Sequence, residues 1–180
     1  MDSDREILER IKNGEISAFE EIYEKYKNQL YRFCFRMISD KETALDIVQD
    51  VFLKLYENIN SIEPNSSLSA LLFKMARNKC LNFIRDKKEK IDTEQIEINS
   101  NFEIEKEFEI KETKERLMKV LDLIGDEYRE ILILREWNGL SYADIAEVLN
   151  TTIPAVKSKL FKARKKLTEI YKKLYGDEEK

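Results

Sequence analysis

The stretch LSYADIAEVLNTTIPAVKSKLFKARKKL, residues 140–167, carries the most specific pattern in the chain. Ser141 followed by Asp144 has the form of a capping box, in which each side chain binds a free backbone N–H at the start of a helix. Thr152 suits the cap of a second helix, and Pro154 suits its first turn, where no backbone donor is needed. The stretch therefore predicts two helices joined by a short polar turn, which is a helix-turn-helix.

The second of these helices has an apolar side and a basic side. At about 100° per residue, one stripe holds Val156, Leu160, Ala163 and Leu167. The opposite side holds Lys157, Ser158, Phe161, Lys162 and Lys165. The flanks hold Lys159, Arg164 and Lys166. A recognition helix needs this layout, because one side packs on its partner helix while the other contacts base edges, with flanking cations able to reach phosphates.

Charge along the chain supports this interpretation. Residues 153–180 hold nine basic and four acidic side chains, although the whole chain has a net charge of −4. A basic segment in an acidic protein is typical of a nucleic-acid contact. The simpler alternative is a helical hairpin with a solvated, lysine-rich side, which accounts for the charge but not for the cap and the turn.

Toward the N-terminus, apolar residues recur every three or four positions and predict helices. We expect one over residues 18–38, one over 41–58, and one that begins at Ser67 or Ser69. A polar loop, 58–67, separates the last two. The expected core side of the middle helix is Ala44, Leu45, Val48, Phe52 and Leu55.

Two outward faces of these helices are candidate binding surfaces. The middle helix places Leu53 among Asp46, Gln49 and Asp50, and an exposed apolar residue among carboxylates is typical of a protein-binding surface. A solvated acidic face with one stray leucine is the simpler alternative. The third helix and the loop before it offer phosphate and base contacts through Asn58, Asn60, Ser61, Lys74, Arg77, Asn78, Arg85 and Lys88.

The segment 89–112 lacks a helical apolar stripe and is predicted to be a linker. Helical spacing resumes at Leu117, and a further helix is expected over 127–138. The sequence thus predicts an all-α protein of two small helical domains, 1–88 and 113–176, joined by this linker.

Several classes of function are disfavoured. The chain has no His, which removes the commonest general base and metal ligand. Cys34 and Cys80 are far apart and lie in apolar helical patterns, so buried thiols are expected. We expect no catalytic residues, no metal, no cofactor and no small-molecule substrate. Without a spanning apolar run or a leader, we expect a soluble, cytoplasmic protein.

Four segments in order resemble the extracytoplasmic-function (ECF) sigma factors of RNA polymerase, over nearly the whole chain. REILERIKNGEISAFEEIYEKYKNQLYRF and TALDIVQDVFLKLYENI are similar to the first helices and the polymerase-binding helix of that family's first domain. LSALLFKMARNKCLNFIR is similar to its −10 helix. The segment from Val120 to Leu167 is similar to its −35-binding domain.

The resemblance implies a role for each surface. Asp46, Gln49, Asp50 and Leu53 match positions that bind the clamp helices of the polymerase's largest subunit, and the second domain is expected at the flap. The loop 58–67, with Asn58, Asn60 and Ser61, matches the segment that captures a flipped −10 base. Lys74, Arg77, Asn78 and Arg85 match the adjoining DNA contacts. Lys157, Ser158, Phe161, Lys162 and Lys165 lie on the helix that matches the −35 reader.

The resemblance also implies an anti-sigma partner, which would hold the protein at the inner membrane face. The sequence departs from the family pattern at Leu71, Leu45, Asn82 and Ile124-Gly125, where Asp126 is the expected helix cap, so the promoter sequence is not predicted. Two other classes stay open: a dimeric stand-alone DNA-binding regulator and a protein-binding adaptor.

Overall fold

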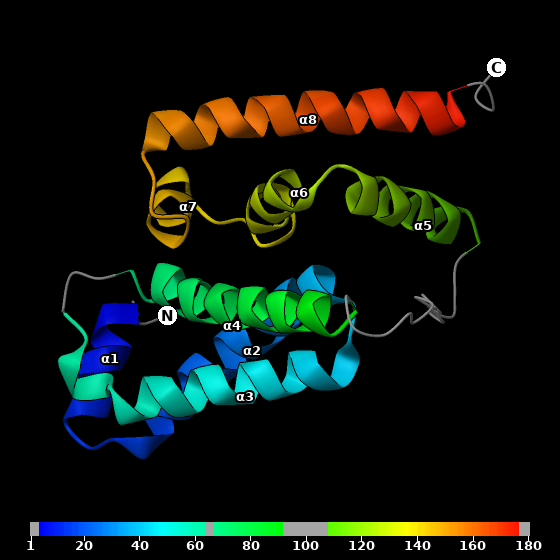
Figure 1. The fold of residues 1–180 in the computed structure, drawn as a ribbon. Helices are drawn as coiled ribbons and strands as arrows, with labels where there is room; N and C mark the ends of the chain where they lie inside the picture. The colour runs from blue at the N-terminus through cyan, green and yellow to red at the C-terminus, as the bar shows by residue number, and fades with distance from the viewer. Residues whose placement is uncertain (1–3, 64–66, 92–107, 177–180) are drawn as a thin grey trace. The chain divides into compact units, whose positions relative to one another are not determined.

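The structure is a computed structural model that describes residues 4–63, 67–91 and 108–176, without the side chains of 88–91 and 108–114. Every regular element in these ranges is helical, as the sequence predicts. The chain divides into two compact units, with helices α1 to α4 in the first and α5 to α8 in the second (Figure 1). No helix in the described ranges has the length and hydropathy needed to cross a membrane.

The first unit is built around its second helix. It contains α1 (Asp4–Lys12), α2 (Ile16–Ile38), α3 (Lys41–Glu57), the 3-10 turn η1 (Ile59–Ser61) and α4 (Leu68–Ile91). Helix α2 packs against α1, α3 and α4, which explains why its apolar stripe is the longest in the chain. The rings of Phe33 and Phe73 meet edge to face at 5.4 Å between centroids, and both are fully buried.

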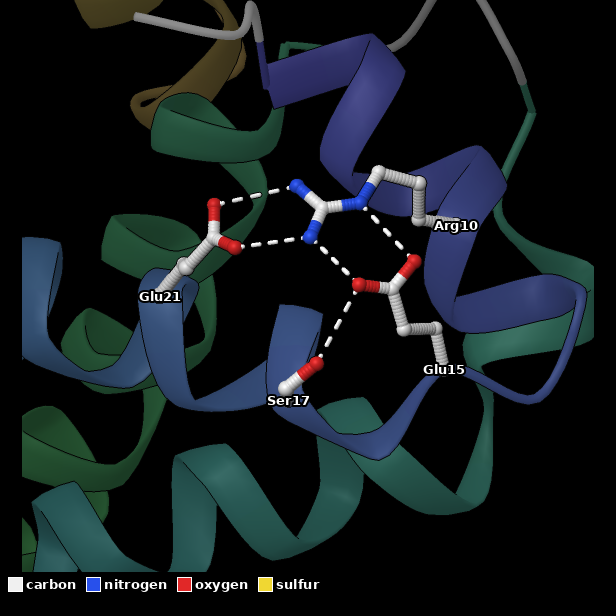
Figure 2. A network of polar contacts seen from close by, with 4 residues as sticks. All are labelled: Arg10, Glu15, Ser17 and Glu21. Carbon is white, nitrogen blue, oxygen red and sulfur yellow. Dashed lines mark hydrogen bonds and ion pairs between the residues drawn. The ribbon is translucent and has the colours of Figure 1, made fainter.

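Polar contacts fasten α1 to α2. Figure 2 shows the Arg10 guanidinium between two carboxylates, with Nε 3.0 Å from Glu15 Oε2 and Nη2 2.8 Å from Glu21 Oε1. These hydrogen bonds raise the pKa of Arg10 and lower the pKa of Glu15. At the other end of α1, Asp4 accepts hydrogen bonds from Lys25 and from the Tyr26 hydroxyl. Helix α1 is therefore held at both ends.

Helix α3 begins at a side-chain cap. Asp40 is the N-cap, and its carboxylate accepts a hydrogen bond from the Thr43 backbone N–H at 2.8 Å. The prediction that Leu45 belongs to the core is wrong, because its side chain is 51% exposed. Ile47 and Val51 are buried instead, so the core side of α3 is rotated slightly from the expected one.

The predicted linker is too long at both ends. Helix α4 continues to Ile91, and α5 (Phe108–Leu123) begins five residues before the expected second domain. Lys and Glu are good helix formers, so a solvated helix end can continue without an apolar stripe. The rest of the predicted linker, 92–107, lies outside the described residues.

The second unit packs α8 (Ile153–Tyr175) against α5 and α6 (Asp126–Leu132). The helix predicted over 127–138 instead passes from α6 into a π-helical turn, η2 (Ile133–Trp137), before α7 (Tyr142–Val148). The prediction that Asp126 caps α6 is also wrong. The N-cap is Gly125, at φ 97°, and its neighbour Asp126 pairs with Arg129 inside the first turn.

Candidate nucleic-acid and protein-binding surfaces

The outward side of α8 is a basic surface with an aromatic residue in it. We call it the recognition face, and it consists of Lys157, Ser158, Phe161, Lys162 and Lys165, all exposed. Phe161 is 70% exposed, whereas Val156, Leu160 and Ala163 on the opposite side are at most 1% exposed. The helical projection is confirmed on the outward side and for the first three residues of the buried stripe, whereas the fourth, Leu167, is only half-buried. A single exposed apolar residue is common on protein surfaces, so it is the position of Phe161 among lysines on a helix-turn-helix that makes this side a candidate contact surface.

The two helices that carry this surface begin as the sequence predicts. Ser141 Oγ accepts a hydrogen bond from the Asp144 backbone N–H at 3.0 Å, and Asp144 Oδ2 accepts one from the Ser141 N–H at 3.3 Å. The capping box is therefore complete. Thr152 caps α8 by accepting a hydrogen bond from the Ala155 N–H at 3.4 Å. The first cap fixes the start of α7, and the second fixes the start of α8.

The three flanking cations of α8 contact their own domain, although we expected them to reach phosphates. Arg164 donates to Glu136 Oε1 from Nε at 3.0 Å and from Nη2 at 2.6 Å, and this contact raises the pKa of Arg164. Lys159 lies 3.0 Å from Glu127, and Lys166 lies 5.4 Å from the Tyr128 ring centre. These contacts secure α8 against α6 and η2.

On the recognition face the lysines are less engaged. Lys165 Nζ is 3.9 Å from Glu169, and Lys157 lies 5.9 Å from the Tyr142 ring centre. Lys162 forms no ion pair with any residue in the described ranges. The cations of α8 therefore form two groups. Those on the flanks of the helix bind side chains of their own domain, and those on the recognition face point to solvent with few contacts.

The outward side of α3 is the second candidate surface. The α3 face consists of Asp46, Gln49, Asp50 and Leu53, all exposed, with Leu53 at 58%. Lys79 of α4 lies 2.7 Å from Asp50 and reduces the negative charge there. Sequence reasoning missed two neighbours, because Leu45 was assigned to the core and Tyr56 was not considered. They are 51% and 52% exposed, and they widen the apolar part of the surface.

The loop after α3 is partly closed on itself. Asn58 Nδ2 donates to the Lys54 carbonyl, and Ser61 Oγ donates to the Asn58 carbonyl, each at 2.8 Å. Asn60 is exposed, and its side chain makes no hydrogen bond within the part of the chain that the structure describes. Of the three polar residues predicted to meet DNA here, Asn60 is the one whose side chain is uncommitted. Residues 64–66 lie outside the described ranges.

The predicted DNA-contacting residues of α4 lie on one side of that helix. Lys74 and Arg77 are half-buried, while Asn78 and Arg85 are exposed. Arg85 forms a long contact with Asp86, at 3.4 Å, which leaves its guanidinium accessible. The side chain of Lys88 is not described. Together with η1, α4 offers a polar and basic surface suited to a nucleic-acid backbone.

Neither the thiols nor the acidic groups suggest a metal or redox centre in the described residues. Cys34 and Cys80 form no disulfide and are fully buried, as predicted. No cluster of three metal-ligating side chains occurs in the ranges that the structure describes.

Comparison with known proteins finds family models and curated relatives that match both units of the chain. The family model for sigma-70 region 2 matches residues 22–90, and that for sigma-70 region 4 matches residues 114–167. The ECF RNA polymerase sigma factor SigM of Bacillus subtilis is 32% identical, over 89% of this chain and 99% of its own length. SigW of the same organism is 30% identical, over 89% and 92%.

Solved structures share the fold. The sigma factor RpoE, determined in complex with the anti-sigma factor NepR from Bartonella quintana, matches with a TM-score of 0.73 at 26% identity. The match covers 86% of this chain and 96% of that one. CnrH, determined with the cytosolic domain of CnrY, matches with the same TM-score at 21% identity, over 94% and 97%, and supports the fold alone. With two sigma-70 regions in order and a relative matched along almost its full length, the chain belongs to the ECF RNA polymerase sigma factors.

Proposed function

We propose that this sigma factor divides its work among the surfaces described above. The α3 face binds core RNA polymerase. The loop after α3, with α4, holds the opened −10 strand, and the recognition face of α8 reads the −35 element. The protein acts by binding, without chemistry of its own, and promoter melting is stabilised by capture of the opened strand.

The observation that carries the proposal is the division of the cations on α8. Arg164, Lys159 and Lys166 are held by acidic or aromatic side chains of the same domain. Lys162 and Phe161 face outward on a helix that is capped and buried on its other side. A rigid helix with donors and one apolar contact on its free side is what major-groove readout requires.

The α3 face fits a protein partner better than it fits DNA. Its carboxylates would repel phosphates, and Leu53 with its apolar neighbours supplies area that a protein partner buries. We assign it to the clamp helices of the polymerase's largest subunit, and we assign the second domain to the flap. The charges would guide encounter, while the exposed apolar side chains would supply most of the affinity.

The −10 assignment rests on a free amide in η1 together with polar and basic side chains on α4. Asn60 is exposed and uncommitted at the tip of η1. Its amide has both donors and an acceptor, which can pair with the edge of an unstacked base. Arg85 and Asn78 on α4 are placed to bind the backbone of the same strand.

We further propose an anti-sigma partner, because a solved relative of this fold is RpoE in complex with the anti-sigma factor NepR. Such a partner would cover the α3 face and so compete with polymerase. Through it the protein would be held at the inner face of the cytoplasmic membrane. Coexpression with the product of the neighbouring gene, followed by copurification, tests this part.

Transcription in vitro with core polymerase and a promoter library tests the main proposal. The wild-type protein should give transcripts from a defined set of promoters. Reversing Asp46 and Asp50 to Lys should abolish polymerase binding, and replacing Ser158 and Lys162 with Ala should spare that binding but lose −35 preference. Absence of any promoter-specific transcript would contradict the proposal.

Two other outcomes would indicate the alternative functions. A dimer that does not bind core polymerase would indicate a stand-alone regulator. Function that persists when the recognition face is substituted would indicate a protein-binding adaptor.

A further inference from the structure

A single lysine of α1 reaches the loop that follows α3. Lys12, the last residue of α1, donates a hydrogen bond from Nζ to the Ile62 carbonyl oxygen at 2.7 Å. The contact is partly buried and joins residues that are 50 positions apart in sequence. Ile62 comes directly after η1, so the bond fixes the end of the turn that presents Asn60.

Apolar contacts reinforce this bond. Ile59 and Ile62, on either side of Asn60, are 7% and 9% exposed, and α1 packs against η1. The side chains of Asn58 and Ser61 close the turn on itself through backbone carbonyls. Ile59 and Ile62 therefore anchor the turn in the core. Asn58, Asn60 and Ser61 are exposed, and of these three only the Asn60 side chain makes no hydrogen bond within the described residues.

Helix α1 is itself a fixed support. The guanidinium of Arg10 binds Glu15 and Glu21 (Figure 2). At the opposite end of the helix, Asp4 accepts hydrogen bonds from Lys25 and Tyr26. Three of these four partners lie in α2, and the fourth, Glu15, is its N-cap. A displacement of α1 would therefore break contacts with the central helix of the domain. The position of Lys12 is thus set by the fold and not by the loop it holds.

We infer that Lys12 is a positioning residue for capture of the −10 strand: it holds the turn 58–62 so that Asn60 is presented to an unstacked base. This inference rests on the proposed function of the loop. Lys12 lies outside the matched span of sigma-70 region 2, which begins at residue 22. The support therefore comes from a helix that the family model does not include.

A direct phosphate contact is the competing role for this lysine. The ammonium group of Lys12 is half-buried and already donates to a carbonyl. A positioning role predicts loss of order in the turn when the donor is removed, with no change in the number of neutralised phosphates. A phosphate contact predicts the reverse, and salt dependence separates the two because each lost contact lowers the slope of log K against log salt by about 0.7 for a single strand.

The test compares K12M, which keeps the aliphatic stem without the donor, with K12R, which keeps a charged donor. K27M is the matched control, because Lys27 is also half-buried and pairs with Glu24 of its own helix. Full-length variants are assembled with core polymerase. Three quantities are measured: hydrogen exchange of the 58–62 amides, affinity for core polymerase, and holoenzyme affinity for a single-stranded −10 oligonucleotide at several salt concentrations.

We expect K12M to exchange faster in the turn and to bind the oligonucleotide about tenfold more weakly, since a hydrogen bond from a charged donor is lost. Core affinity and salt slope should match the wild type, K12R should lie between, and K27M should behave as wild type. Unchanged exchange and affinity in K12M would overturn the inference while wild-type transcription upholds the proposed function. A lower salt slope with unchanged exchange would also overturn it. If the wild type gave no promoter-specific transcript, the proposed function would fail, and the inferred role would fail with it even where the exchange data confirm the contact.

Discussion

The outward faces of α3 and α8 have the same arrangement with opposite charge. On α3, Leu53 is 58% exposed beside Asp46 and Asp50, and on α8, Phe161 is 70% exposed beside Lys162. Each apolar side chain is large enough to supply substantial contact area, and each is surrounded by groups of one sign. The charge decides which class of partner approaches, and the apolar residue adds area once the partner is bound.

The two faces differ in which of their charged residues form ion pairs with neighbouring helices. On α8, acidic and aromatic side chains of the domain hold the flanking cations and leave the outward lysines loosely held. On α3, the neighbouring helix reaches into the face itself, because Lys79 pairs with Asp50. The comparison predicts that Asp46 contributes more than Asp50 to the electrostatic attraction of polymerase. It also predicts a clearer separation between paired and unpaired charges on α8 than on α3.

The largest effect should come from the buried side of α8. Leu160 is 1% exposed, and Leu160→Ala leaves a cavity that costs about 2–5 kcal/mol. Phe161→Ala, one position along, should leave stability within about 0.5 kcal/mol because the ring is in solvent. Urea unfolding followed by the fluorescence of Trp137, the one Trp in the chain, measures the second domain directly. Equal losses in both variants would show that the division of α8 is wrong.

Charge reversal on α3 should give the next largest effect. Changing Asp46 and Asp50 to Lys places two like charges against a basic partner and should weaken polymerase binding about a hundredfold or more. The single change at Asp46 should cost more than that at Asp50, since Asp50 is already paired. A double reversal at Glu9 and Glu20, exposed carboxylates of α1 and α2, is the control. Affinity for core polymerase is the measurement, and an equal loss in the control would mean that only net charge matters.

Two lysines three positions apart sharpen the comparison on α8. Lys162→Ala should weaken binding to −35 duplex DNA up to about tenfold and lower the salt slope by about 0.9, since an unpaired cation is removed. Lys159→Ala should change DNA binding little, because Lys159 is paired with Glu127. Fluorescence anisotropy at several salt concentrations gives both quantities. Identical salt slopes for the two variants would argue against the view that Lys162 is available to phosphates while Lys159 is not.

Much of this architecture follows from the sequence because its signals are local. The capping box at Ser141 and the cap at Thr152 depend on neighbours within three residues, and both are confirmed. The buried stripe of α8 follows from helical periodicity alone. Such features do not require knowledge of which helices meet.

The errors concern contacts between segments. Leu45 was expected in the core because it is apolar, but only the position of α2 and α4 decides which side of α3 is covered. The pairing of Lys79 with Asp50 and the bond from Lys12 to Ile62 join residues 29 and 50 positions apart. The π-helical turn after α6 likewise has no simple local signal. The roles of the individual DNA- and polymerase-binding residues stay predictions.

The smallest effect concerns the cap that begins α3. The Thr43 N–H stabilises the charged form of Asp40 and lowers its pKa below the ordinary value of 3.8. A carboxylate with a lowered folded-state pKa stabilises the fold fully above its unfolded pKa, and this contribution is lost as pH falls through the folded pKa. Asp40→Ala should therefore cost about 1 kcal/mol at pH 6, and the gap between variant and wild type should shrink as pH falls below about 4.

Asp40→Asn is the matched control, because Asn caps a helix about as well as Asp but does not titrate. Its stability should lie close to wild type at pH 6, and in acid it should become the more stable of the two, because only the wild type loses cap stabilisation as Asp40 is protonated. Circular dichroism during urea unfolding at pH 6 and at pH 3 measures all three proteins, while Trp137 fluorescence separates the second domain. A gap between Asp40→Ala and wild type that stayed constant into acid would mean that the carboxylate charge contributes nothing to the cap. The neutral carboxyl of Asp40 would then cap α3 as well as the charged one, by accepting the same hydrogen bond from the Thr43 N–H.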